Sequence, residues 1–161
     1  MEVVRAAQAL FVFWIGAFAG LVALNNVVDY DTNFRFVQHV LNMDTTFEDS
    51  KLRRRAIRSP ALHHFAYCAI IAAEALTAAL CLCGAARLFA ALGSGVDTFH
   101  QAKTLAFAGL ALGFAVWFGG FMVAGSQWFA SWQSKQWSGR EAAFMFYTPI
   151  AVVFLILLHK T

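Results

Sequence analysis

The sequence has little charge, little proline and little cysteine. Of its 161 residues, 13% are charged and 60% are hydrophobic, whereas soluble domains average about 25% charged and about 45 to 50% apolar residues. This shortage of charge excludes a soluble enzyme with a charged surface. The aromatic content of 16%, placed inside long apolar runs, excludes a disordered chain. The net charge of +3 is small for a nucleic-acid-binding surface. The composition is that of a membrane protein.

Motifs that carry covalent or metal chemistry are also absent. The three cysteines, Cys68, Cys81 and Cys83, all fall in one apolar run, and an odd number inside lipid argues against a disulfide framework. We find no nucleophile elbow, phosphate loop, zincin helix or CxxC pair. Basic residues are not interleaved with aromatics as in single-strand binders. The sequence therefore favours a protein that is not an enzyme and has no nucleic-acid partner.

Four apolar stretches are long enough to cross the hydrocarbon core, which takes about 20 residues in a helix. They do not show the alternation of a transmembrane barrel, and a helix satisfies its own backbone in lipid. We interpret the first as a retained span, because it is longer than a secretory signal's apolar run and lacks a cleavage site. The sequence predicts an all-α fold over residues 1–161, a single integral membrane domain built as a four-helix transmembrane bundle. The predicted spans are residues 6–24, 62–83, 104–125 and 142–158.

The segment between the first two spans, residues 25–61, is predicted to be an ordered loop. It contains no glycine, and its one proline, Pro60, is placed where the second helix can begin. Phe34, Val37 and Leu41 recur at helical spacing. This spacing predicts a short amphipathic helix, which lies in the membrane interface or packs on the ends of the bundle.

The distribution of Lys and Arg bears on orientation. Four spans place both termini on one side, with four basic residues there and eight on the other side. This count favours a cytoplasmic long loop. The start at Arg5 and the tryptophan-rich second loop are instead typical of cytoplasmic termini, and we favour that orientation in a bacterial inner membrane while leaving both open. We interpret the basic cluster Lys51–Arg58 as a topology signal, with binding of anionic headgroups as the alternative.

The second span carries a polar face that includes Glu74. At about 100° per residue, its members fall within about 40° of one line. Glu74 lies about 16 Å below His63 by helical rise, near mid-membrane. An ionisable residue at that depth marks a functional site, a buried partner or a group held neutral. A proton or ion relay, a contact to a quinone or another subunit, and a structural hydrogen bond all stay open. The face comprises His63, Tyr67, Ile70, Glu74, Thr77 and Cys81.

Histidines raise the question of a cofactor. His63 and His64 point about 100° apart on one helix and cannot both face one iron, and the histidines of other spans lie on the far side. His39 shares a side with them and, with Asp44, could complete a zinc or copper site. Hydrogen bonding of these histidines to loop backbone is the commoner arrangement. We expect no cofactor, with haem, a quinone or a transition metal as alternatives.

Glycine and tryptophan patterns indicate packing. Two GxxxG faces, typical of close helix contacts, occur in the first and third spans at Gly16, Gly20, Gly109 and Gly113. The second loop carries Trp128, Trp132, Gln133 and Trp137, which we interpret as an interfacial aromatic belt, with a binding groove as the alternative. Lys103, at the start of the third span, is expected to extend to the interface.

Several strings resemble a family of bacterial small integral membrane proteins that are predicted to span four times and have no known function. They are NVVDYDTNFRFVQHVLNMDTTF from Asn26, RAIRSPALHH from Arg55, FHQAKTLAFAGL from Phe99 and WFASWQSKQWSGREAAF from Trp128. The resemblance covers nearly the whole chain, although Gln127 stands where an acidic residue is expected. It implies a four-helix membrane protein and no particular reaction.

Three functions follow as hypotheses. The first is a non-catalytic accessory or anchoring subunit of a larger inner-membrane complex, respiratory or transport-related. Its basis is the small size, the small-residue faces and the lack of a catalytic set. The second is a redox element in which the histidines and Glu74 bind a metal, haem or quinone. The third is a small-solute or proton carrier through the Glu74 face. Expected partners are membrane lipids and other membrane protein subunits.

Overall fold

A computed structural model describes residues 2–161, and within that range the chain is helical with no strand. Four helical stretches are long and apolar enough to cross a membrane, which confirms the predicted fold class. The short helix expected in the first loop is also present. The spans are α1 (Glu2–Val28), α3 (Pro60–Ala90), α4 with α5 and η2 (Val96–Ala102, Thr104–Phe114, Ala115–Trp128) and α6 (Arg140–Leu158). Outside the spans lie α2 (Tyr30–Asn42) and the 3-10 turns η1 (Lys51–Arg55) and η3 (Ser131–Gln133).

The helices extend beyond the predicted apolar stretches. By helical rise, α3 is about 46 Å long, more than the hydrocarbon core of about 30 Å. Backbone hydrogen bonding continues past the point where apolar composition ends, so hydropathy alone underestimates helix length. The start of α3 is as predicted: Pro60 is its first residue, and the Ser59 hydroxyl accepts a hydrogen bond from the Leu62 amide at 3.4 Å.

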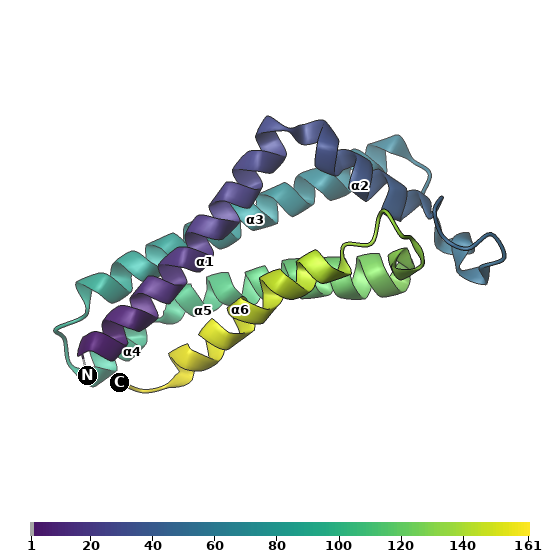
Figure 1. The fold of residues 1–161 in the computed structure, drawn as a ribbon. Coiled ribbons are helices and arrows are strands. Elements are labelled where there is room, and N and C mark those ends of the chain that lie inside the picture. Colours follow the sequence, from purple (N-terminus) through teal and green to yellow (C-terminus); the bar gives the residue numbers. More distant parts are fainter. Residues whose placement is uncertain (1) are drawn as a thin grey trace.

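The helix α3 has the most extensive packing in the bundle, with α1 and α5 against it, and α6 lies beside α5 and η2. Figure 1 shows both chain ends at one end of the bundle, here called the terminal end. The opposite end, here called the loop end, carries α2, η1 and η3. From the terminal end, α1 rises away from α6, and α2 lies across the loop end.

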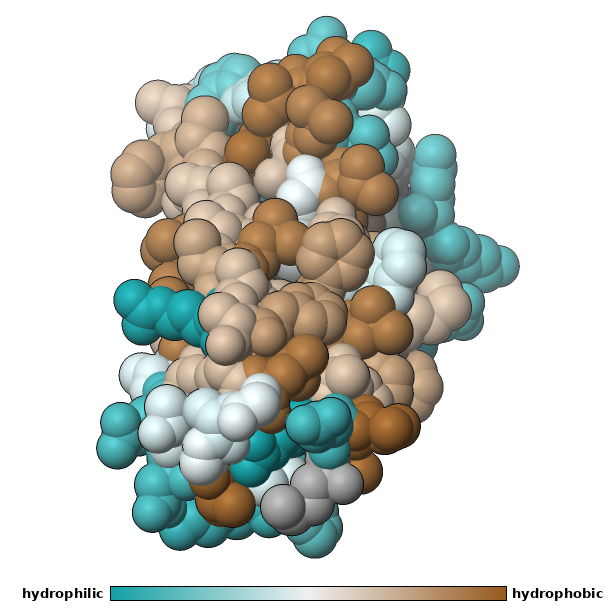
Figure 2. All heavy atoms as spheres, turned by 90° about the vertical axis from the view of Figure 1, so that its left-hand side faces the viewer, coloured by the Kyte–Doolittle hydropathy of each residue, from teal (hydrophilic) through white to brown (hydrophobic). Residues whose placement is uncertain are grey.

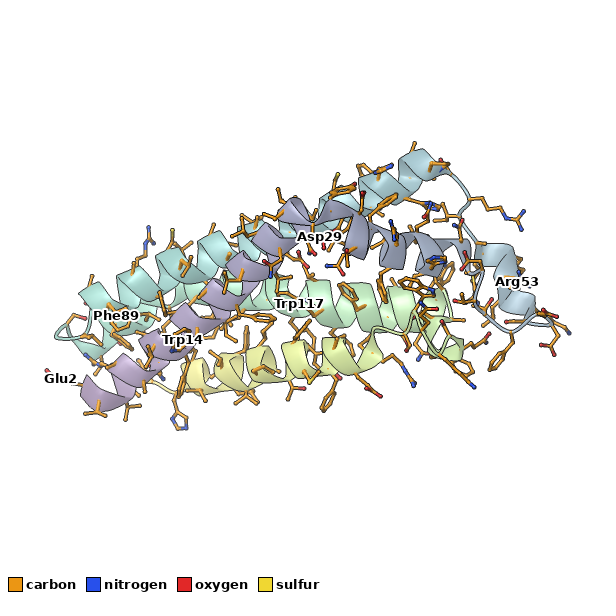
Figure 3. All side chains as sticks on the ribbon, turned by 45° about the horizontal axis from the view of Figure 1, so that its top comes forward. Glu2, Trp14, Asp29, Arg53, Phe89 and Trp117 are labelled. Atoms are coloured by element: carbon orange, nitrogen blue, oxygen red, sulfur yellow. The ribbon has the colours of Figure 1, made fainter. Side chains whose placement is uncertain are left out.

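The helix α2 follows α1 after the single non-helical residue Asp29. Its apolar face is buried at Val37, Val40 and Leu41, and it packs on α1 and α3. This is the amphipathic helix that the sequence predicts, in the arrangement packed on the bundle. Figure 3 shows Asp29 at the bend, with Arg53 at the loop end far from Glu2.

Close packing at the centre of the bundle requires small residues. A Cβ on Gly16 would lie 3.0 Å from the Cys81 Cβ, and one on Gly109 would lie 2.6 Å from the Cys81 sulfur. Gly84 is as tight as Gly109, and its Cβ would meet backbone, the nitrogen of Ala106 at 2.6 Å. Both predicted GxxxG faces therefore point inward onto α3 and bring α1 and α5 close to it.

The outer surface of the spans is apolar. Trp14, Leu21 and Leu155 each expose 60% or more of their surface. Figure 2, which views the terminal end, shows apolar side chains over much of this face and hydrophilic ones along its lower end and right edge. Exposed apolar area of this extent is what a lipid-facing surface requires.

The third span departs from a regular α-helix. Its second half, η2, is a π-helix, and the Phe129 amide closes the pattern with a bond to the Ala124 carbonyl five residues back at 2.9 Å. π-Helical geometry is rare and often occurs at functional sites. Apolar periodicity does not distinguish it from an α-helix, so the sequence did not predict it.

Candidate functional site

The Glu74 side chain points into the bundle from the middle of α3, with 1% of its surface exposed. Its Oε2 accepts a hydrogen bond from Asn26 Nδ2 at 2.8 Å. Among residues 2–161 this is the one hydrogen bond to the carboxyl group, and the side chain also lines a cavity. A buried carboxyl with a single donor lacks partners that it would have in water.

Asn26, at the end of α1, links the carboxyl group to Asn33 of α2 and also bonds Tyr67 of α3. Its Oδ1 accepts from Asn33 Nδ2 of α2 at 2.6 Å, and its backbone carbonyl accepts from the Tyr67 hydroxyl of α3 at 3.3 Å. The chain Asn33 to Asn26 to Glu74 therefore joins α2, α1 and α3. The sequence indicated Glu74 and Tyr67 but missed both asparagines, because they flank the predicted first span and show no motif.

A cavity of about 370 Å³ lies beside this chain of hydrogen bonds, with walls from all four spans and from α2. Figure 3 shows Trp117, one of its wall residues, near the middle of the bundle. We call it the Glu74 cavity. Its polar lining is Asn25, Asn26, Asn33, Tyr67 and Glu74, and its larger apolar wall residues are Val22, Phe36, Val37, Ile70, Trp117, Phe121 and Phe146.

A second cavity, of about 240 Å³, adjoins the first at the loop end. We call it the apolar cavity, because every residue that lines it is apolar or glycine. Four residues line both cavities and form the partition between them: Phe36, Val37, Ile70 and Phe121. The remaining wall is made by α2, α3 and the π-helix η2, at Val40, Leu41, Ala66, Gly120, Ala124, Gly125 and Phe129.

Toward the terminal end the Glu74 cavity meets a close-packed apolar layer. The Thr77 hydroxyl, one turn from Glu74 toward the terminal end, donates a hydrogen bond to the Ala73 carbonyl at 2.8 Å. Below it, the inward side chains of α3, α5 and α6 are apolar and fully buried, as at Leu110 and Ile150. No polar side chain of this layer continues the path from Glu74.

The four predicted metal ligands do not meet at one site: His39 and Asp44 pair with each other, and His63 and His64 each have other partners. His39 Nδ1 pairs with Asp44 at 2.9 Å, and the imidazole stacks on Trp137 with ring centroids 4.4 Å apart. His63 is buried, and its Nε2 donates to the Ile57 carbonyl at 2.7 Å. Within residues 2–161, no three His, Cys, Asp or Glu side chains are grouped to hold a metal ion.

The fourth predicted ligand, His64, belongs to an aromatic stack between α2 and α3. Its ring lies on Phe34 with centroids 4.1 Å apart, and its Nδ1 is 2.9 Å from the Tyr30 hydroxyl. Desolvation, followed by the contact with Cys68, raises the pKa of Tyr30, so this hydroxyl keeps its proton. The stack holds α2 over the Glu74 cavity.

The predicted groove residues of the second loop bind the first loop. The Arg55 guanidinium lies 4.5 Å from the Trp128 ring centroid, and Gln133 Oε1 accepts from the Phe47 amide at 3.0 Å. Trp132 contacts the Phe47 ring edge-on at 6.1 Å. Neither these residues nor Trp137 lines either of the two cavities.

The prediction that Lys103 extends to the interface is wrong. Its side chain is fully buried, and its ammonium donates to the carbonyls of Leu157 at 3.0 Å and His159 at 2.6 Å. These carbonyls end α6, where the helix dipole favours a cation. The ammonium also lies 5.3 Å from the Phe99 ring centroid. Burial is tolerated because the side chain meets carbonyl oxygens inside the protein.

Arg5 has a matching role at the same end. It is 4% exposed and donates to the carbonyls of Leu92 at 2.9 Å and Ser94 at 2.6 Å, just beyond α3, and to the Thr161 backbone oxygen. Its guanidinium carbon lies 4.8 Å from the centroid of the Phe99 ring, which the Lys103 ammonium also faces. We call Arg5, Lys103 and Phe99 the cation cluster. All of its resolved hydrogen bonds go to protein backbone.

Comparison with known proteins identifies a family and nothing more specific. Residues 4–161 match the family described as "Predicted small integral membrane protein (DUF2165)". No curated protein and no solved structure matches the chain.

Proposed function

The chain belongs to the DUF2165 family of predicted small integral membrane proteins, and on that premise we propose that it binds a small apolar molecule in the Glu74 cavity. The molecule carries one cationic or hydrogen-bond-donating group. The observation that carries this proposal is the Glu74 carboxyl group, buried next to open space with one hydrogen bond from the protein.

The chemistry of the cavity defines the ligand. Glu74 is the one ionisable carboxyl group in its lining, and the larger wall residues are aromatic or aliphatic. A donor on the ligand would supply the hydrogen bond that the carboxyl lacks, while the rest of the molecule contacts apolar walls. A volume of about 370 Å³ is within the range of ligand sites in proteins, about 300 to 1,000 Å³.

The surroundings of the cavity favour binding over passage. A carrier for protons or solutes needs polar groups that continue to the other membrane surface. The apolar layer around Leu110 and Ile150 provides none. The carrier hypothesis remains a prediction, to be tested by flux into proteoliposomes with wild type and Glu74→Gln.

Quenching of Trp117 tests binding directly. The four other tryptophans are replaced by Phe, and the protein is placed in lipid nanodiscs. The probes are 4-bromobenzylamine, whose bromine quenches indole fluorescence, and 4-bromotoluene as a neutral analogue. We expect saturable quenching by the amine that is weakened at least about tenfold in Glu74→Gln, because a charge-assisted hydrogen bond contributes about 1.5 to 3 kcal/mol.

Glu141→Gln is the matched control, since Glu141 is exposed at the start of α6 and lies outside the cavity. It should leave quenching unchanged. Equal quenching by the amine and by 4-bromotoluene, or no loss in Glu74→Gln, would contradict the proposal.

Membership of a larger membrane complex is a second proposal. Its support is the small size of the chain and the absence of a catalytic motif. The small-residue faces no longer add to it, because they pack on α3 within the bundle. An accessory or anchoring subunit should co-purify with partners from bacterial inner membranes in mild detergent. A stable lone monomer would contradict this role.

Orientation is also a proposal. Cytoplasmic termini remain our expectation, against a Lys and Arg count that favours a cytoplasmic long loop. Single cysteines at the exposed positions Glu48 and Asp97 report the loop end and the terminal end respectively. In cells, an impermeant maleimide should label Glu48→Cys and spare Asp97→Cys if the termini are cytoplasmic. The reverse pattern would assign the loop end to the cytoplasm.

A further inference from the structure

We infer that the ligand of the Glu74 cavity is a single-chain amphiphile, with its donor group at Glu74 and its apolar chain in the apolar cavity between α2 and η2. This inference rests on the proposed function and names the class of molecule. A long-chain amine is the simplest example.

The two cavities differ in polarity in the way that the two ends of an amphiphile differ. Five polar side chains line the Glu74 cavity, and none lines the apolar cavity. Buried water needs two to four polar partners, so water cannot fill the apolar cavity favourably. A hydrocarbon chain can fill it, because the chain gains van der Waals contacts with the apolar walls and leaves no polar group unpaired.

The partition between the cavities is made of movable side chains. Phe36 of α2 and Phe121 of η2 lie with ring centroids 6.2 Å apart and planes 27° apart, and both are half-buried. Displacement of these two rings would join the two spaces and leave room for a chain that starts at Glu74.

The π-helix provides the outer wall of the apolar cavity and a means to close it. A Cβ on Gly120 meets no atom within 4 Å, and this residue lines the apolar cavity. A leucine there would fill the space for the chain. Gly119, on the same helix, is equally open but lines neither cavity, so Gly119→Leu is a matched control.

The test compares a short and a long probe in the protein with Trp117 as its single tryptophan. Binding of 4-bromobenzylamine is measured by the quenching of Trp117 fluorescence. The affinities of decylamine and butylamine are measured by competition, from the amount of 4-bromobenzylamine that each displaces. In wild type we expect decylamine to compete more strongly than butylamine. In Gly120→Leu, the affinity for decylamine should fall about tenfold or more, because several methylene groups lose their site. The affinity for 4-bromobenzylamine should stay unchanged.

The controls separate the two proposals. Glu74→Gln should lower the affinity for all three amines, and Gly119→Leu should leave all three affinities unchanged. If Gly120→Leu leaves decylamine unchanged, or weakens 4-bromobenzylamine equally, the chain site is overturned while the Glu74 site stands. If Gly119→Leu lowers the affinity for decylamine as much as Gly120→Leu does, the loss comes from a general disturbance of η2, and the chain site is likewise overturned. If 4-bromobenzylamine does not bind wild type, the proposed function itself fails.

Discussion

The terminal end and the middle of the bundle both bury ionisable side chains, but the partners of these side chains differ. At the terminal end, the Lys103 ammonium and the Arg5 guanidinium meet backbone oxygens beyond the ends of α6 and α3. Toward the loop end, the Glu74 carboxyl has one hydrogen bond and an adjacent cavity. Buried charge that the protein surrounds with partners supports the fold. A buried ionisable group that has few partners in the protein and lies beside a cavity is available to a ligand.

Packing follows the same division. Near the middle and terminal half, Gly84 and Gly109 have no room for a methyl group, because α3 and α5 are in backbone contact there. Toward the loop end, Gly119 and Gly120 face open space. The contact between α3 and α5 therefore has the density of a structural core, and η2 keeps room beside Gly119 and Gly120.

The largest expected effect is on stability, at Lys103. Lys103→Met retains the length of the side chain and removes two hydrogen bonds from an ammonium to carbonyls. Since each such bond contributes about 1.5 to 3 kcal/mol, the free energy of unfolding should fall by about 3 kcal/mol or more. Unfolding in mixed micelles by a denaturing detergent measures it.

Lys160→Met is the control for this change, because Lys160 pairs with Asp97 where both are exposed. It should alter the same free energy by less than about 1 kcal/mol. Equal effects of the two substitutions would show that the cation cluster is not structural.

Gly84→Ala should have an intermediate effect. The added Cβ would lie 2.6 Å from the Ala106 nitrogen and 2.8 Å from its Cα, and backbone cannot move aside as a flexible side chain can. Overpacking of this kind costs about 1 to 3 kcal/mol. The same unfolding assay applies, and Gly119→Ala should be neutral or slightly stabilising because it enters open space and favours a helix. Similar losses at both positions would remove the distinction between the two halves.

The smallest effect on stability is expected at Glu74. Glu74→Gln retains an oxygen that can accept from Asn26 and removes a group whose charge is costly to bury. The free energy of unfolding should stay within about 1 kcal/mol of wild type or rise. A loss as large as that of Lys103→Met would instead make Glu74 a structural residue and would contradict the contrast drawn between the two ends.

The sequence was sufficient for the features that depend on local pattern. The four spans, the amphipathic α2 and the start of α3 at Pro60 each follow from composition, spacing or a single capping residue. The inward position of Glu74 follows in the same way, because helical geometry places it in line with Tyr67 on one face.

Features that depend on which helices meet could not be predicted. Asn26 and Asn33 become a site only when the bend at Asp29 folds α2 back over α3. Lys103 was placed at the interface because a span was expected to begin there. In the fold, α6 ends beside it and its carbonyls provide partners inside the protein.

Cys81 of α3 lies between glycines of two neighbouring helices, α1 and α5. Gly16 approaches it from α1 and Gly109 approaches it from α5, and the residue is fully buried between them. Evolution is therefore free to exchange this thiol for another small side chain, such as alanine or serine, but not for leucine. Across homologous chains, position 81 should vary in chemistry while staying constant in size.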